Sequence, residues 1–225
     1  MPDFSYEAEA AAVAKRDARA ELLARRRTLS APARAEAAGR VQAELVALVR
    51  RLRPRRMTAY VPVGSEPGGP DLPAVLLAAL PADAELLLPV LLPDLDLDWA
   101  AYTGPEGLIA AGRGLREPDG PRLGVGAVAD ADLVVVPALA VDRNGRRLGR
   151  GGGSYDRALA RVPAGTLTVV PLHDGELVEA LPAEPHDRQV RAVLTPSDGM
   201  RTLDGGPGLS RGVAPHTSAG RTRGE

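Results

Sequence analysis

The feature that most constrains the fold is an almost entirely apolar run, Leu133–Val141, followed at once by a glycine-rich segment, residues 142–156. An apolar run of this length bounded by turn residues is typical of a strand buried on both faces. Arg157–Arg161 can then begin a helix. Glycines 149, 151, 152 and 153 can adopt positive φ and let a ligand approach the backbone closely. A strand, a glycine loop and a helix start in this order predict an α/β domain with an anion site at the helix start.

The rest of the chain favours the same fold class, because apolar strands alternate with helices along it. We expect a three-layer α/β/α architecture with a mostly parallel sheet, in a single domain with N-terminal helices. Ser30 is a plausible N-cap, with Pro32 in the first turn of the helix that follows. The predicted helices cover residues 7–29, 31–53 and 71–80, and the predicted strands cover 57–63, 85–92, 95–102, 133–141, 166–171 and 189–195.

Composition sets the outer limits. A chain of 225 residues fits one domain with a sizeable core, which we place at residues 1–198. Residues 199–225 are rich in Gly, Arg, Ser, Thr and Pro without periodicity, and we expect a disordered tail. A net charge of −1 argues against general nucleic-acid binding, and no apolar run approaches the roughly 18 residues of a membrane helix. The chain has no cysteine, so disulfides and thiolate metal sites are excluded. We expect the protein to be cytoplasmic and monomeric.

The glycine-rich segment carries its own chemistry. Arg146, Arg147 and Arg150 bring countercharge for phosphate, and Asp156 is a carboxylate that can hold a divalent cation. A Walker A motif is excluded because the chain contains no Gly-Lys pair, and the dinucleotide pattern Gly-x-Gly-x-x-Gly fails at Ser154. A flexible glycine turn with solvated arginines is the alternative interpretation of the same residues.

The segment resembles the hallmark of the 5-formyltetrahydrofolate cyclo-ligase (5,10-methenyltetrahydrofolate synthetase) family, Asp-x-x-Gly-x-Arg-Leu-Gly-x-Gly-x-Gly-Tyr-Tyr-Asp. Ser154 departs from it, because it replaces the first of the two tyrosines. The positions in register are Asp142, Gly145, Arg147, Leu148, Gly149, Gly151, Gly153, Tyr155 and Asp156.

Three further places gain meaning from this resemblance. Lys15 and Arg19 lie four residues apart and share one face of the first predicted helix, where the family has a basic pair that reaches ATP. Glu66 follows a predicted strand, at the position of a family glutamate that contacts the pterin, although the family's Glu-x-x-Thr is not kept. Asp187 matches a magnesium-holding aspartate, and Arg191 stands where many relatives have a second acid. Without the resemblance, these residues would be read as a solvated helix face and polar loops.

The resemblance implies ATP- and Mg²⁺-dependent ring closure of 5-formyltetrahydrofolate to 5,10-methenyltetrahydrofolate, with ADP and phosphate released. It implies catalytic roles for Arg147, Arg150 and Tyr155, folate contacts at Glu66, Tyr155 and Trp99, and magnesium ligands at Asp156 and Asp187. The implied ATP contacts are Lys15, Arg19, Arg147, Leu148, Gly149, Arg150, Gly151, Gly152, Gly153, Ser154 and Tyr155.

Other interpretations stay open on the sequence. A noncatalytic folate- or nucleotide-binding relative is one, for which Ser154 and Arg191 are the motivating departures. A sugar-phosphate or acyl-CoA enzyme on a related sheet is another, with Glu66 as base and the glycine loop as phosphate site. Trp99 and Tyr102 can be folate contacts or core residues.

Overall fold

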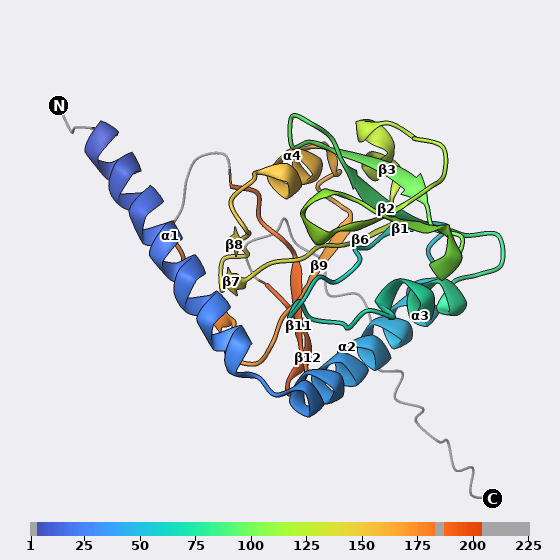
Figure 1. Ribbon diagram of the computed structural model, residues 1–225, viewed down its shortest axis with the longest axis horizontal. Helices are drawn as coiled ribbons and strands as arrows, with labels where there is room; N and C mark the ends of the chain where they lie inside the picture. The colour runs from blue at the N-terminus through green and yellow to red at the C-terminus, as the bar shows by residue number, and fades with distance from the viewer. Residues whose placement is uncertain (1–3, 183–186, 204–225) are drawn as a thin grey trace, which may run out of the picture.

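The computed structural model describes residues 4–182 and 187–203, with side chains from residue 9 onward. A seven-stranded sheet forms the centre (Figure 1), in the order β12-β11-β9-β6-β1-β2-β3. All neighbours from β11 to β2 are parallel, and only the edge strands β12 and β3 run antiparallel to theirs. The predicted α/β class with a mostly parallel sheet is therefore confirmed. The strands are β1 Arg56–Thr58, β2 Glu85–Leu91, β3 Leu97–Ala101, β6 Leu133–Val135, β9 Leu167–Pro171, β11 Ala192–Thr195 and β12 Gly199–Thr202.

Both faces of the sheet are buried, because successive side chains of a strand point to opposite sides. On β2, Leu86 and Leu88 pack into the core beneath α2 and α3, whereas Leu87 packs into the core on the other face. Figure 1 shows α2 and α3 on one side of the sheet and α4 on the other. Ser30 caps α2 as predicted, accepting a hydrogen bond from Ala33 N at 3.3 Å. These helices are α2 Ala31–Leu52, α3 Leu72–Ala79 and α4 Ser154–Arg161.

The predicted strand at 133–141 is wrong as a single element. It is two strands, β6 in the large sheet and β7, Ala140–Asp142, in a separate three-stranded sheet with β8, Arg147–Leu148, and β10, Leu177–Val178. Pro137 lies between them and has no N–H for a ladder. The chain therefore leaves the main sheet here and delivers the glycine-rich segment beside the carboxyl end of β6.

The C-terminal boundary also differs from expectation. β12 pairs with β11 through Arg201 and Val193, so the sheet continues past residue 198, into the stretch predicted to be disordered. Residues 204–225 of that predicted tail lie outside the described residues. The other small elements are a two-stranded sheet, β4 Leu108–Ala110 with β5 Arg116–Pro118, and 3-10 turns at Pro105–Gly107, Gly112–Gly114 and Val125–Asp130.

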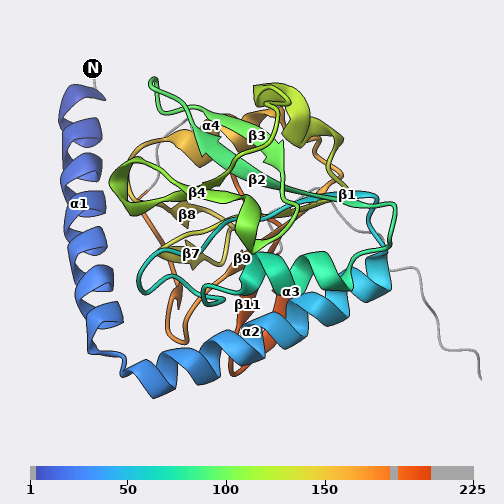
Figure 2. The same cartoon turned by 45° about the vertical axis from the view of Figure 1, so that its right-hand side comes forward.

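Helix α1, Phe4–Thr28, stands apart from α2 and α3, along the side of the molecule where β7 and β8 lie (Figures 1 and 2). Leu22 packs against Leu139 and Leu148 of that small sheet. Arg26, which is 1% exposed, is the deeper anchor. Its Nε donates to Glu176 Oε1 at 2.7 Å. No helix in the described part of the chain is long and apolar enough to span a bilayer.

We expect Asp96→Asn to destabilise the fold by about 2 kcal/mol, because Asp96 accepts two hydrogen bonds from Arg161, at 2.5 and 3.0 Å, and joins the start of β3 to the end of α4. The Arg161 guanidinium lowers the pKa of Asp96 below its usual value. The carboxylate's contribution is therefore present above about pH 4 and is lost as the pH falls through the lowered pKa. Urea unfolding of both proteins at several pH values measures this.

Asp130→Asn is the matched control, because Asp130 is 75% exposed and 3.4 Å from its partner Arg56. An equal effect of the two substitutions at pH 7, or an Asp96→Asn effect that persists in acid, would contradict the prediction.

Candidate active site

A cavity of about 440 Å³ lies at the carboxyl ends of β1 and β6, the edge where ligands bind in sheets of this kind. It collects residues from α1, the loop after β1, the glycine-rich segment and the segment before β11. Nearly every residue singled out from the sequence lies on its wall. These are Lys15, Arg19, Glu66, Arg147, Leu148, Gly149, Arg150, Gly151, Gly152, Gly153, Ser154, Tyr155, Asp156 and Asp187.

The glycine-rich segment is fixed at its base. Asp142 is fully buried, and its Oδ1 accepts hydrogen bonds from Asn144 N at 2.9 Å and Arg146 N at 3.0 Å. Gly145 has φ +82°, and a Cβ there would lie 2.4 Å from Val190 O. At the far end Gly153, with φ +68°, precedes α4. The segment thus runs from a closed turn to a helix N-terminus, whose unpaired N–H groups favour an anion.

Arg147 is the most deeply placed cation of this wall. Its side chain is 4% exposed, its Nη2 lies 2.8 Å from Asp156 Oδ1, and its guanidinium lies 5.8 Å from the centre of the Tyr155 ring. Burial lowers the pKa of Arg147 and Asp156 opposes this, so the group stays a cation at neutral pH. Its buried Nε has no hydrogen-bond partner among the described residues. A buried donor without a partner beside a glycine loop is one that an anion can satisfy.

Helix α1 supplies two basic side chains next to this segment. Lys15 Nζ contacts both carboxylate oxygens of Asp187, at 2.8 and 2.9 Å. Arg19 Nε donates to Gly149 O at 2.9 Å, so one member of the basic pair contacts the glycine-rich segment, and both members line the cavity. Arg188 N lies 3.5 Å from Asp156 Oδ1, which brings the segment carrying Asp187 alongside Asp156.

Asp156 and Asp187 are thus neighbours on the cavity wall, each held by a cation. Within the described residues, no three acidic or histidine side chains gather as a metal cluster. Two carboxylates alone do not enclose a metal ion, yet two carboxylates and phosphate oxygens together are a donor set that suits Mg²⁺.

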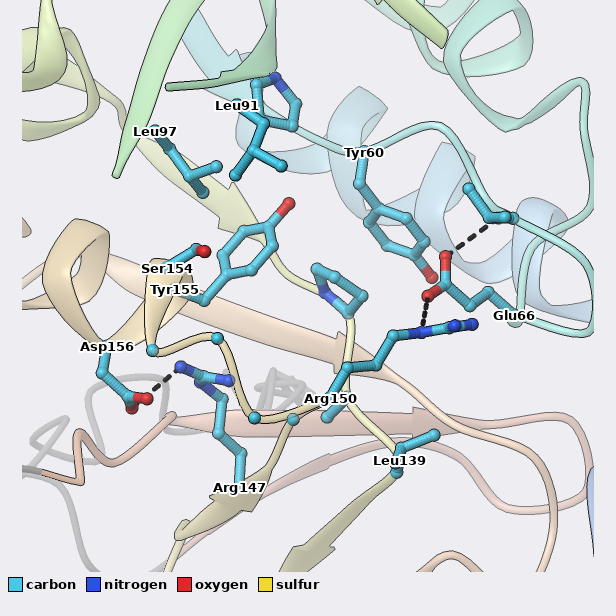
Figure 3. A pocket seen from close by; sticks show the side chains of 18 of the residues that line it. Tyr60, Glu66, Leu91, Leu97, Leu139, Arg147, Arg150, Ser154, Tyr155 and Asp156 are labelled. Atoms are coloured by element: carbon cyan, nitrogen blue, oxygen red, sulfur yellow. Dashed lines mark hydrogen bonds and ion pairs between the residues drawn. The ribbon is translucent and has the colours of Figure 1, made fainter. Parts of the chain in front are cut away.

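Glu66 lies across the cavity from Asp156 (Figure 3). Its Oε2 accepts a hydrogen bond from Val63 N at 2.9 Å, and its Oε1 accepts one from Arg150 Nε at 3.1 Å. The Arg150 side chain is 54% exposed. One ion pair therefore joins the loop after β1 to the glycine-rich segment at the cavity opening.

Sequence reasoning missed the residues that hold this loop. Tyr60 donates its hydroxyl hydrogen to Pro67 O at 2.7 Å, and burial raises the pKa of Tyr60. His173 Nε2 lies 2.9 Å from Ser65 O, which makes Nε2 the protonated nitrogen, since a carbonyl only accepts. No spacing in the sequence links His173 to residue 65.

The expected folate contact at Trp99 is wrong. It is fully buried in the core with Val128 and Ala127, and it is not part of the cavity wall. Because side chains alternate between the two faces of β3, Trp99 points toward the 3-10 turn Val125–Asp130 and not toward the cavity. Tyr102 is likewise a core residue. The apolar wall comes instead from Pro89, Leu91, Leu97, Leu115, Pro137 and Leu139.

Tyr155 is the aromatic residue of the glycine-rich segment that does reach the cavity. In Figure 3 its ring lies between Arg147 and the pair Leu91 and Leu97. Burial raises its pKa, and the Glu66 carboxylate raises it further. The phenol therefore stays neutral and is available as a hydrogen-bond donor at any physiological pH.

Several known proteins are similar to this chain in sequence and in fold. The model of the 5-formyltetrahydrofolate cyclo-ligase family matches residues 11–196. A 5-formyltetrahydrofolate cyclo-ligase of Mycolicibacterium smegmatis is 47% identical over 154 residues, which are 66% of this chain and 77% of that protein. The NMR structure of Aquifex aeolicus 5,10-methenyltetrahydrofolate synthetase has a TM-score of 0.71 at 29% identity, covering 88% of this chain and 97% of the other. A Mycoplasma pneumoniae 5,10-methenyltetrahydrofolate synthetase shares the fold, with a TM-score of 0.62 at 17% identity over 80% of this chain and 96% of the other.

We expect Gly145→Ala to destabilise the protein by at least about 2 kcal/mol, because its Cβ would strike Val190 O in a backbone conformation that disfavours side chains. Gly39→Ala is the control, since a Cβ at this helical position meets nothing within 4 Å. That variant should gain about 0.5–1 kcal/mol. Thermal unfolding of both variants measures the difference, and equal midpoints would refute it.

Proposed function

This chain belongs to the 5-formyltetrahydrofolate cyclo-ligase family, and from that membership we propose that it converts 5-formyltetrahydrofolate to 5,10-methenyltetrahydrofolate with consumption of ATP. The supporting observation is convergence. Residues 15, 19, 66, 147–156 and 187 come from separate parts of the chain and line one cavity. The glycine-rich segment and the apolar residues Leu91, Leu97 and Leu139 thus line the same cavity, which a reaction between two substrates requires.

The chemistry needs ATP because the formyl oxygen is a poor leaving group. Transfer of the γ-phosphoryl group to that oxygen releases ADP and creates a better one. N10 then attacks the formyl carbon and gives up its proton, the carbon–oxygen bond breaks, and the phosphate departs with that proton as hydrogen phosphate to leave the methenyl bridge. The protein's contribution is to position the two substrates and to offset charge, as in other phosphoryl transfers.

We assign the triphosphate to the glycine-rich segment. Backbone N–H groups from Leu148 to Tyr155 and the start of α4 supply neutral donors, and Arg147, Arg150, Lys15 and Arg19 supply charge. The unpartnered Nε of Arg147 supports this assignment directly. Arg150, which bonds Glu66 through an exposed side chain, can move to phosphate at little cost, because exposed ion pairs contribute only about 0–1 kcal/mol.

Asp156 and Asp187 fit a magnesium role by their chemistry, since both are carboxylates on the phosphate side of the cavity. A bound Mg²⁺ ion would offset part of the negative charge of the phosphate groups. Arg147 and Lys15, which hold these carboxylates, are the groups that would then turn to phosphate.

We assign the folate to the remaining wall. Glu66 accepts hydrogen bonds from the pterin's N–H groups, and its carboxylate is held in place by Val63 N. Tyr155 borders both the formyl group and the phosphate. Ser154 adds little apolar surface where the family has a tyrosine, and Leu91 and Leu97 offer such surface nearby. We further propose that the protein acts as a monomer in the cytoplasm.

We expect Arg147→Met to lower kcat/KM by about 10²-fold, because one cation aimed at transition-state charge is worth about 3 kcal/mol. The assay follows the near-ultraviolet absorbance of 5,10-methenyltetrahydrofolate with ATP and Mg²⁺. Arg146→Met is a matched control from the adjacent position, since Arg146 is 40% exposed and does not line the cavity. Equal losses in the two variants would contradict the assignment of Arg147.

Asp156→Asn should raise the Mg²⁺ concentration needed for half-maximal rate, and Asp83→Asn, on an exposed turn, should not.

If the wild-type protein binds ATP and folate without turnover, it is a noncatalytic relative. If it binds neither, the proposed function fails.

A further inference from the structure

The hairpin formed by β4 and β5 brings a second group of cations to the cavity. Arg113 and Arg116 line its wall, as do Leu115 and Glu117 between and beside them. In Figure 2 the hairpin, labelled β4, lies in front of β7 and β8 with its tip directed toward α1. The phosphate assignment uses neither of these arginines.

The hairpin belongs to the apolar side of the cavity. Glu117 Oε1 accepts a hydrogen bond from Leu91 N at 2.9 Å, which ties β5 to the end of β2. Figure 3 shows Leu91 and Leu97 on the side of Tyr155 away from Arg147. The cavity thus has one basic wall at the glycine-rich segment and another beside Leu91, with apolar surface and Tyr155 between them.

The two basic walls differ in their partners. Lys15, Arg147 and Arg150 each face a carboxylate in the structure. Arg113 has no ion-pair or hydrogen-bond partner among the described residues. Arg116 makes only long contacts, at 3.4 and 3.5 Å, to the backbone oxygens of Pro105 and Leu108. Both side chains are exposed at the cavity edge, and their charge is available to a ligand.

Arg113 is also held in an unusual conformation. Its φ is +62°, between Gly112 and Gly114. A non-glycine residue in the left-handed region costs about 1–3 kcal/mol unless its surroundings favour it. The backbone therefore fixes the direction in which this side chain leaves the hairpin tip.

We propose that Arg113 and Arg116 bind the carboxylates of the glutamate tail of the folate substrate. This proposal rests on the proposed function, because that function supplies a ligand with a flat pterin, an apolar aminobenzoyl ring and an anionic tail. With the pterin at Glu66 and the ring against Leu91 and Leu97, the tail leaves the cavity past the β4–β5 hairpin. Two guanidinium groups then meet two carboxylates, a pairing that guanidinium geometry suits.

The contribution to affinity is modest, because both arginines are exposed and salt screens such pairs. Each pair is worth at most about fivefold in affinity, and the two together about tenfold. The interaction acts as a specificity element, distinguishing a folate with its tail from the same ring system without it.

The test compares 5-formyltetrahydrofolate with the primary carboxamide of 5-formyltetrahydropteroate, which keeps the pterin, the ring and the amide but lacks both glutamate carboxylates. Dissociation constants for both are measured by calorimetry with wild-type protein and the Arg113→Met/Arg116→Met variant. Wild-type protein should bind the tailed compound about tenfold more tightly at low salt. The variant should bind both alike, and added salt should shrink the wild-type preference but leave the variant unchanged. An Arg55→Met/Arg122→Met variant removes equal charge outside the cavity wall and should keep the preference.

Three outcomes overturn the proposal. One is equal wild-type affinity for the two compounds, and another is an equal loss for both in the variant. The third is a variant that weakens ATP binding and retains the tail preference, which would assign the hairpin arginines to the triphosphate. Because these are binding measurements, a tail preference without turnover would overturn the proposed function alone.

Discussion

The site depends on one buried ion pair, Arg26 with Glu176. The two residues are 1% and 4% exposed, and burying two charges is unfavourable unless their hydrogen bonds are well satisfied. Here Glu176 accepts from Arg26 Nε and Nη2 and from His173 N, and Arg26 Nη2 also donates to Ala138 O on the cavity wall. The buried Arg26 Nη1 has no hydrogen-bond partner among the described residues. His173 in turn bonds Ser65 O, next to Glu66. One network therefore orients α1, the cavity wall and the loop after β1. Among the described side chains of α1, Leu22 is the only hydrophobic one that is fully part of the buried core.

The cavity itself is organised by opposite charges that hold one another. Lys15 faces Asp187, Arg147 faces Asp156, and Arg150 faces Glu66. The pairs made by Lys15 and Arg150 join segments that are far apart in the sequence, and the pair made by Arg147 closes the glycine-rich segment on itself. The charged groups of the cavity wall are therefore positioned before any ligand arrives. Such pre-positioning lowers the ordering cost of binding. In each pair, both the cation and the carboxylate are candidate ligand contacts. A phosphate group would replace the carboxylate beside a cation, and a metal ion would replace the cation beside a carboxylate.

Features that depend on neighbouring residues were predicted well from the sequence, and features that depend on contacts between distant residues were not. Ser30 and Pro32 marked the start of α2 because capping is a short-range interaction. The residues of the glycine-rich segment were singled out together because they are contiguous in the sequence, and the structure shows that residues 147–156 line one cavity. Pro137 was passed over inside an apolar run, although its missing N–H is what splits that run into two strands. Trp99 was expected as a folate contact. The 3-10 turn Val125–Asp130 covers the face of β3 that carries this residue, and the sequence of β3 does not indicate that. Arg26 and Glu176 lie 150 positions apart, and nothing in either neighbourhood indicates the other.

The contact between Lys15 and Asp187 spans 172 positions, which has a consequence for how the protein is made. Synthesis proceeds from the N-terminus, and domains form as their segments emerge from the ribosome. α1 is among the first elements to emerge, but the carboxylate that faces its lysine is among the last of the described residues. β11 follows that carboxylate and inserts between β9 and β12. The nascent chain therefore passes through a long period with a basic helix and no completed cavity, and it acquires its binding site only when translation of the domain is nearly finished.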